Sequence, residues 1–274
     1  MNSPSLFFQR IINKLIKILT HFIANIFGFD IITGIKIRRI TSLRHLGTNY
    51  GGWFIPSKFL NSESVCYCVG AGEDISFDVS LAKNYGSKVF IFDPTPRAIE
   101  HFDELKKLTE KGEKMPINNS NKEFYHLDSS DLTKIKFFEF GIWDKEEIIR
   151  FYAPQNPAHV SYSILNLQKT NKFFEAKVKP ISSIMQSLNH KKISLLKLNV
   201  EGAEYNIINS IVNENIDIDI FCIVFDELNQ VLKKSIVSRI KGSLEQLKKS
   251  NFIAIKKIGP AYTFINRKLE KSFR

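Results

Sequence analysis

Residues 65–74 read VCYCVGAGED, in which an apolar run leads directly into a Gly-x-Gly turn. A strand that enters such a turn and is followed by a helix lets a ligand approach the backbone, because glycine has no side chain to block it. The helix that follows places unpaired amides and a partial positive charge beside the same turn. The stretch therefore predicts an α/β sheet with a ligand site at the end of this strand.

A second apolar run, residues 88–92, ends at Asp93-Pro94, and Asp93 lies 21 residues after Gly72. A carboxylate at the end of the neighbouring strand can accept hydrogen bonds from both hydroxyls of a ribose. The two stretches together favour a cofactor that contains a nucleoside.

The residues after the turn separate two cofactors of this kind. A dinucleotide site would carry a third glycine where this chain has Ile75, which disfavours a nicotinamide-dependent oxidoreductase. S-adenosylmethionine needs room only for its methionine carboxylate, and Glu73 and Asp74 suit the cationic end of that molecule. The oxidoreductase stays as an alternative that titration with a nicotinamide cofactor would test.

The rest of the chain alternates short apolar runs with amphipathic stretches, which predicts a mostly parallel sheet covered on both faces. We expect a Rossmann-like α/β fold with a C-terminal antiparallel hairpin and an N-terminal helical extension. Residues 1–60 would form the extension and its connection, and residues 61–274 the main domain. The expected single strands are residues 64–69, 88–92, 123–127, 193–198 and 216–225. Two hairpins are also expected: residues 135–143 would pair with residues 148–152, and residues 252–258 with residues 261–265. The expected helices are residues 75–84, 96–110, 181–188, a stretch ending at 211, and 231–250.

The N-terminal residues 6–29 have the pattern of an amphipathic helix. Arg10, Lys14, Lys17 and His21 would share one helical face, with apolar residues around the rest. The longest stretch without a charged side chain, residues 18–29, is shorter than the about 20 residues that span a bilayer. The pattern suits a helix lying on an anionic membrane surface, or one that docks on its own domain or on a partner subunit.

The formal net charge of +11 is unevenly distributed. Residues 1–60 carry +7 and residues 231–274 carry +10, whereas residues 61–230 carry −6. A nucleic-acid binder would spread a basic surface over its body, so nucleic acid is not expected as a partner. Only three cysteines occur, which excludes a disulfide scaffold and indicates a reducing compartment. We expect a cytoplasmic protein, with the N-terminal helix at the inner face of the membrane.

The stretch LLKLNVEGAE, residues 195–204, is the second informative motif. A buried strand would deliver Asn199, Glu201 and Glu204 to the sheet edge where ligands sit in open α/β folds. Alternatively, the two glutamates cap the first turn of the next helix, which each would stabilise by about 0.3–1 kcal/mol. Both roles are compatible.

Together the two motifs resemble the FkbM-type family of S-adenosylmethionine-dependent methyltransferases. Its pattern is a glycine-rich first loop, an acidic residue after the second strand, and a late Lys-x-Asp-x-Glu-Gly-x-Glu segment, here KLNVEGAE at residues 197–204. Residues 156–163, NPAHVSYS, resemble the serine-containing loop on the family's substrate side. The resemblance covers about residues 64–227 and implies methyl transfer, usually to a hydroxyl of a sugar, glycan or glycolipid.

The resemblance also implies roles for individual residues. Gly70 and Gly72 would line the methionine part of the cofactor, Asp93 would hold the ribose, and Asp128, after the third strand, would meet the adenine amine. His159 is the candidate base, with Asp226 and Glu201 behind it, and no metal is expected. The full cofactor set is Gly70, Ala71, Gly72, Glu73, Asp93, Pro94 and Asp128, and the substrate-side set is Ser161, Ser163, Asn199 and Glu204.

Three positions depart from the family pattern. Asn199 stands where the family usually has Asp, Cys68 where an acidic residue often opens the first motif, and Val224 where Glu is expected. An amide cannot act as a base. These departures support an alternative in which the protein is a catalytically silent relative that keeps the fold as a binding or scaffold subunit.

Overall fold

The computed structural model describes residues 28–118, 120, 122–155, 162–166, 170–229 and 233–273. At its centre lies a seven-stranded sheet. Five neighbouring strands are parallel, and β12 runs antiparallel between β10 and β11. The predicted mostly parallel sheet with a C-terminal antiparallel hairpin is confirmed. In spatial order the strands are β5 (Ile135–Phe138), β4 (Lys88–Phe92), β3 (Val65–Val69), β9 (Ile193–Leu198), β10 (Ile218–Val224), β12 (Ala261–Asn266) and β11 (Phe252–Ile258).

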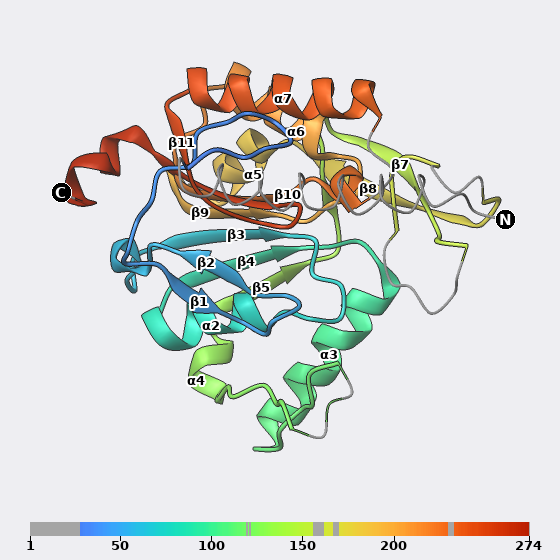
Figure 1. Ribbon diagram of the computed structural model, residues 1–274. Helices are drawn as coiled ribbons and strands as arrows, with labels where there is room; N and C mark the ends of the chain where they lie inside the picture. The colour runs from blue at the N-terminus through green and yellow to red at the C-terminus, as the bar shows by residue number, and fades with distance from the viewer. Residues whose placement is uncertain are drawn as a thin grey trace, which may run out of the picture.

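Helices cover both faces of this sheet (Figure 1). One face carries α2 (Ser76–Tyr85), α3 (Pro96–Glu110) and α4 (Ser129–Leu132), and the other carries α5 (Ile181–Ser187), α6 (Glu204–Asn213) and α7 (Lys234–Lys249). Local chemistry sets their ends. Proline stands in the first turn of α3, where its missing N–H is not needed. Gly86 ends α2 in the left-handed conformation that glycine adopts without strain.

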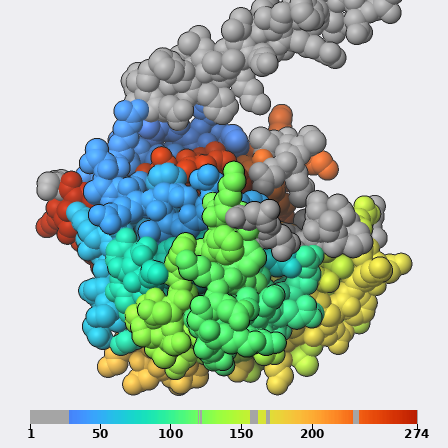
Figure 2. Space-filling model, turned by 90° about the horizontal axis from the view of Figure 1, so that it is seen from below, coloured from blue at the N-terminus to red at the C-terminus, as the bar shows by residue number. Residues whose placement is uncertain are grey.

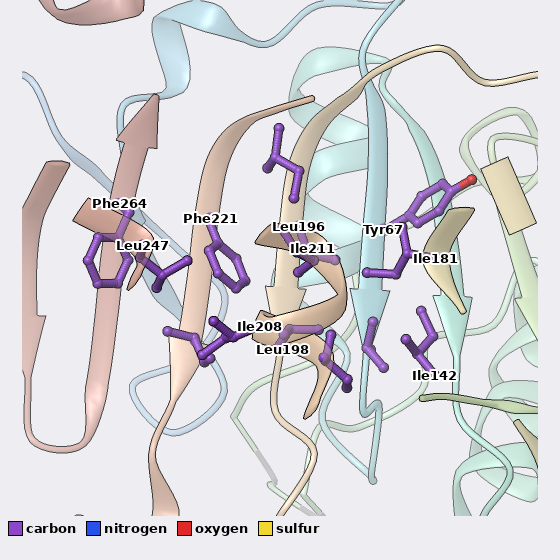
Figure 3. Close-up of a cluster of buried hydrophobic side chains, with 14 of the residues drawn as sticks. Tyr67, Ile142, Ile181, Leu196, Leu198, Ile208, Ile211, Phe221, Leu247 and Phe264 are labelled. Atoms are coloured by element: carbon purple, nitrogen blue, oxygen red, sulfur yellow. The ribbon is translucent and has the colours of Figure 1, made fainter. Parts of the chain in front are cut away.

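The core has two layers because successive strand residues point to opposite faces. Tyr67, Leu196 and Phe221 pack on the face under α5, α6 and α7, with Ile208 and Leu247 from the helices (Figure 3). The opposite layer joins the strands to α2 and α3. β9 is buried on both faces, which explains its nearly continuous apolar sequence ISLLKL.

The third strand and the first hairpin were predicted wrongly. Residues 123–127 form no strand, and β5 takes the place beside β4, where Phe138 stacks on Phe92 at 5.1 Å between ring centroids. The predicted hairpin partners do not pair with each other. β6 (Gly141–Ile142) and β7 (Glu147–Tyr152) both pair with β8 (Phe173–Lys179), giving a separate sheet of order β6-β8-β7. The run 135–143 divides because its first four residues complete the main sheet.

Residues 28–60 pack closely on the rest of the chain. β1 (Arg44–Leu46) and β2 (Trp53–Ile55) form a hairpin whose Leu46, Trp53 and Ile55 join the core layer under α2. Short 3-10 turns lie at Ser57–Phe59, Asp226–Asn229 and Arg267–Phe273. In Figure 2 the blue N-terminal segment borders the red C-terminal residues. There the Tyr262 hydroxyl donates to Asp30 at 2.6 Å.

The predicted amphipathic helix falls almost wholly on residues 1–27, which lie outside the described residues. Within the described part of the chain, no helix combines the length and the apolar character needed to cross a bilayer.

Candidate functional site

A cavity of about 590 Å³ opens at the carboxyl ends of the parallel strands. β3 and β9 are neighbours there. The strands that follow β3 in the chain, β4 and β5, lie on one side of this pair, and β10, which follows β9, lies on the other. This switch point is where open α/β sheets bind ligands. The volume lies within the range of about 300–1,000 Å³ typical of small-molecule sites. Loops after β3, β4, β9 and β10 and the turn between β1 and β2 line the cavity.

Glycine serves a different structural purpose at each of the two positions in the turn. Gly70 has a φ of 81°, and a Cβ there would lie 1.9 Å from the Asn199 carbonyl oxygen. Packing between two strand ends therefore demands glycine. Gly72 has a φ of 55° and no atom within 4 Å of the place its Cβ would take. Because Gly72 lines the cavity, its missing side chain leaves the backbone open to a ligand.

Asp93 is the anchor of this turn. One carboxylate oxygen accepts from the amides of Ala71 at 2.7 Å and Gly72 at 3.1 Å. The other accepts from the amide of Thr95 at 2.8 Å and from its hydroxyl at 2.6 Å. A carboxylate offers about four acceptor positions, so all of them serve the loops that carry the cofactor set. A ribose hydroxyl would reach this carboxylate only by taking over one of these bonds.

The two acidic residues after the turn are also held in place. Glu73 forms a two-pronged ion pair with Arg97 at 2.8 and 2.9 Å. Asp74 is buried and accepts from the Thr48 hydroxyl at 2.6 Å and from Asn118 at 3.1 Å. Thr48 belongs to the β1–β2 turn, so this contact fixes that turn against the start of α2.

The β1–β2 turn is the part of the cavity wall that sequence reasoning missed. It contributes Asn49, Tyr50, Gly51 and Gly52, and His45 of β1 lines the cavity beside them. Gly52 is required there, because a Cβ would lie 2.3 Å from the Thr48 carbonyl oxygen. The glycine-rich sequence GTNYGGW at residues 47–53 is the sequence feature that could have indicated this turn.

The late motif brings Asn199 and Glu201 to the cavity, and the loop after β10 brings Asp226. Glu201 has a φ of 39°, and its amide donates to the Asp226 carboxylate. The Oδ2 atom of Asp226 is buried without a hydrogen-bond partner among the described residues. Burial raises the pKa of Asp226 to about 7, and the nearby Glu201 carboxylate adds to the rise.

Two other predicted residues support this motif without lining the cavity. Glu204 begins α6 and accepts from the Gly202 amide at 2.8 Å, and burial raises its pKa to about 8. This amide precedes the helix, and α6 has no side-chain cap hydrogen bond, so Glu204 holds the turn before α6 and the predicted capping of the helix is not seen. The Ser163 hydroxyl donates to the Glu201 carbonyl at 2.6 Å, so it positions the turn that carries Glu201.

One further predicted residue lies outside the cavity. Asp128 is exposed and caps α4 by accepting from the Asp131 amide at 2.9 Å. Its predicted position depended on a strand at residues 123–127, and these residues form none. His159 and Ser161 lie outside the described residues. The remaining predicted cofactor residues, Gly70, Ala71, Gly72, Glu73, Asp93 and Pro94, all line the cavity.

The cavity fits S-adenosylmethionine in chemistry as well as size. Five carboxylates line it, which suits a ligand with a sulfonium and an ammonium group; they belong to Glu73, Asp74, Asp93, Glu201 and Asp226. A part of the ligand can lie against the backbone of Gly72, in the space that a Cβ would occupy. Over the described ranges, no three His, Cys, Asp or Glu side chains gather in a way that could hold a metal ion.

The strand order, with one antiparallel strand next to the edge, and the acidic cavity beside a Gly-x-Gly turn define a class I, Rossmann-like methyltransferase. The FkbM methyltransferase domain matches residues 65–250. The chain belongs to this family, and its membership supports S-adenosylmethionine as the cofactor.

The chain also resembles solved methyltransferase structures at low sequence identity. The chain resembles the METTL16 methyltransferase domain with a TM-score of 0.39 and 9% identity, over 74% of this chain and 59% of that one. It thus spans about three fifths of that protein. It resembles precorrin-6y C5,15-methyltransferase from Geobacter metallireducens with a TM-score of 0.36 and 11% identity, over 76% and 83% of the two chains. No curated protein sequence matches the chain.

Proposed function

We propose that this protein transfers a methyl group from S-adenosylmethionine to a sugar hydroxyl of a glycan or glycolipid. The observation that carries the proposal is the Asp226 carboxylate, which lines the cavity with a buried oxygen that has no partner among the described residues. Transfer to a hydroxyl requires a group that accepts the hydroxyl proton, and a base works best when its pKa lies near the working pH. A carboxyl whose pKa is raised to about 7 meets this requirement.

The other lining residues have positioning roles in this proposal. When bound, S-adenosylmethionine supplies the activated methyl group. The turn held by Asp93 orients S-adenosylmethionine, and the Glu201 amide holds Asp226 at the cavity wall. Phe151 and Tyr162 also line the cavity and give it aromatic surface on that side. Alignment of the hydroxyl with the methyl group then provides most of the rate enhancement.

A transfer assay tests this function. The full chain would be incubated with methyl-labelled S-adenosylmethionine and a panel of glycans and glycolipids. We expect the label to appear as a methyl ether on a sugar hydroxyl, identified by mass spectrometry of the product. Cofactor binding without labelled product or released S-adenosylhomocysteine for any acceptor would contradict the proposal and favour the silent-subunit alternative that Asn199 and Val224 raise.

We further propose that residues 6–29 hold the enzyme at the inner, anionic face of a membrane in the cytoplasm. The support is the amphipathic pattern with its one cationic face. The full chain should sediment with vesicles that contain anionic lipid. The triple variant Arg10→Glu, Lys14→Glu, Lys17→Glu should remain in the supernatant, and unchanged sedimentation would contradict this attachment.

A further inference from the structure

The cavity has a second wall whose charge is opposite to that of the carboxylates. Cross-strand pairing places Cys68, Lys197, Cys222, Thr263 and Lys256 in one row across β3, β9, β10, β12 and β11. Residues directly opposite each other in a sheet point to the same face. Lys197, Thr263 and Lys256 of this row line the cavity. Lysines thus stand at two points along this wall.

Lys256 owes its place in the row to an irregularity in its strand. The pairing of β11 with β12 shifts register between Ala254 and Lys256. A β-bulge of this kind turns a side chain to the other face and is common next to active sites. The Lys256 ammonium lies 4.9 Å from the centroid of the Phe54 ring, and it forms no ion pair with a residue that the structure describes. Its neighbour Lys257 is instead paired with Asp30 at 3.2 Å.

The other lysine of the row is already neutralised. The Lys197 ammonium is buried and pairs with Asp78 at 2.8 Å. The charge available to a ligand on this wall therefore comes from Lys256. The His45 ring also contacts Phe54, with 4.7 Å between ring centroids. The carboxylates that match a cationic cofactor lie elsewhere in the cavity, on the loops after β3, β4, β9 and β10.

We propose that the methyl acceptor carries an anionic group, a carboxylate or a phosphate, and that Lys256 binds it. This inference rests on the proposed function and specifies its substrate class. A cation beside an apolar ring and within a partly enclosed cavity is weakly screened, so its attraction for an oxyanion is stronger than at an open surface. A neutral sugar would leave the ammonium without a counter-charge in the complex.

Binding of three sugars to the full chain saturated with S-adenosylhomocysteine tests this inference. The probes are methyl glucuronide, glucose 6-phosphate and the neutral methyl glucoside, titrated by calorimetry. We expect at least one anionic probe to bind tenfold or more tightly than the neutral one. Lys256→Met should reduce that ratio to less than threefold, and Lys256→Arg should retain most of it. Lys249→Met, which removes an exposed charge at the end of α7 outside the cavity, should leave the ratio unchanged.

Each outcome bears on the inference. The stronger anionic probe identifies a carboxylate or a phosphate as the group recognised. Equal affinities for charged and neutral sugars, no binding of either anionic probe, or a ratio that survives Lys256→Met would overturn it. The proposed function fails separately. An anion preference that depends on Lys256 without methyl transfer would contradict only the function, and transfer to neutral sugars without such a preference would contradict only this inference.

Discussion

Replacing Asp226 with Asn is expected to lower kcat about 100- to 10,000-fold, which is the contribution typical of a positioned general base. The amide has nearly the shape of the carboxyl but cannot accept a proton from the acceptor hydroxyl. The substitution should not destabilise the fold. Burial raises the pKa of Asp226 to about 7, so the native state disfavours the charged form, and removing that charge at pH 8 should leave the melting temperature equal or higher.

The same carboxyl predicts the pH dependence of the reaction. Below about pH 7 it becomes protonated and can no longer act as a base, so kcat/KM should fall about tenfold per pH unit on the acid side. In the Asp226→Asn variant, kcat/KM should not show this fall below about pH 7.

Glu227→Gln is the matched control for Asp226→Asn. Glu227 is the next carboxylate along the chain, but it bonds to the Tyr205 hydroxyl and Arg239 and does not line the cavity. We expect its kcat to stay within a few-fold of wild type. A variant Asp226→Asn that keeps more than a tenth of wild-type kcat would assign the base to another group.

Lys197→Met is expected to lower the free energy of unfolding by about 3–5 kcal/mol, the loss typical of breaking one partner from a buried ion pair. Burial opposes the charge on Lys197, but Asp78 outweighs it and raises the pKa of this ammonium. Asp78 has no exposed surface, and its Oδ1 atom has no partner among the described residues. Without Lys197, its carboxylate would stay buried beside apolar side chains with no compensating charge.

A double variant separates this cause from simple loss of packing. Lys197→Met with Asp78→Leu removes both charges and keeps similar volume, and such replacements are often neutral or stabilising. Urea unfolding should therefore show most of the lost stability recovered. A single variant that loses less than about 1 kcal/mol, as surface ion pairs do, would contradict the buried-pair account.

The ion pair lies beside Cys68, one of the three departures from the family pattern. Cys68 stands directly opposite Lys197 in the sheet, where the family often has an acid. Here the negative partner comes from α2 instead, through Asp78. Burial raises the pKa of the Cys68 thiol, and the Asp78 charge beside it adds to the rise.

The sequence predicted most of the central fold because its signals are local. β4, β9 and β11 begin and end at the predicted residues, since each is a short apolar run closed by charged or turn residues. Residues 123–127 and 135–143 failed for a non-local reason. Both runs have strand-like composition, and only pairing with β4 decides which one enters the sheet.

The site was predictable in part for the same reason. The glycine turn and Asp93 lie at the ends of predicted strands, so their convergence follows from the topology. The wall formed by β2 and Lys256 was not predictable in this way. It depends on a bulge in β11 and on the packing of a hairpin formed by residues that precede the first motif.

Calorimetric titration of the full chain with S-adenosylmethionine tests the central claim most directly. The claim is that the cavity beside Gly72 and Asp93 is a cofactor site. We predict saturable one-to-one binding, which Asp93→Ala should weaken at least tenfold because the four hydrogen bonds that shape the cofactor loops would be lost. No binding of S-adenosylmethionine to the folded wild-type chain would contradict the account.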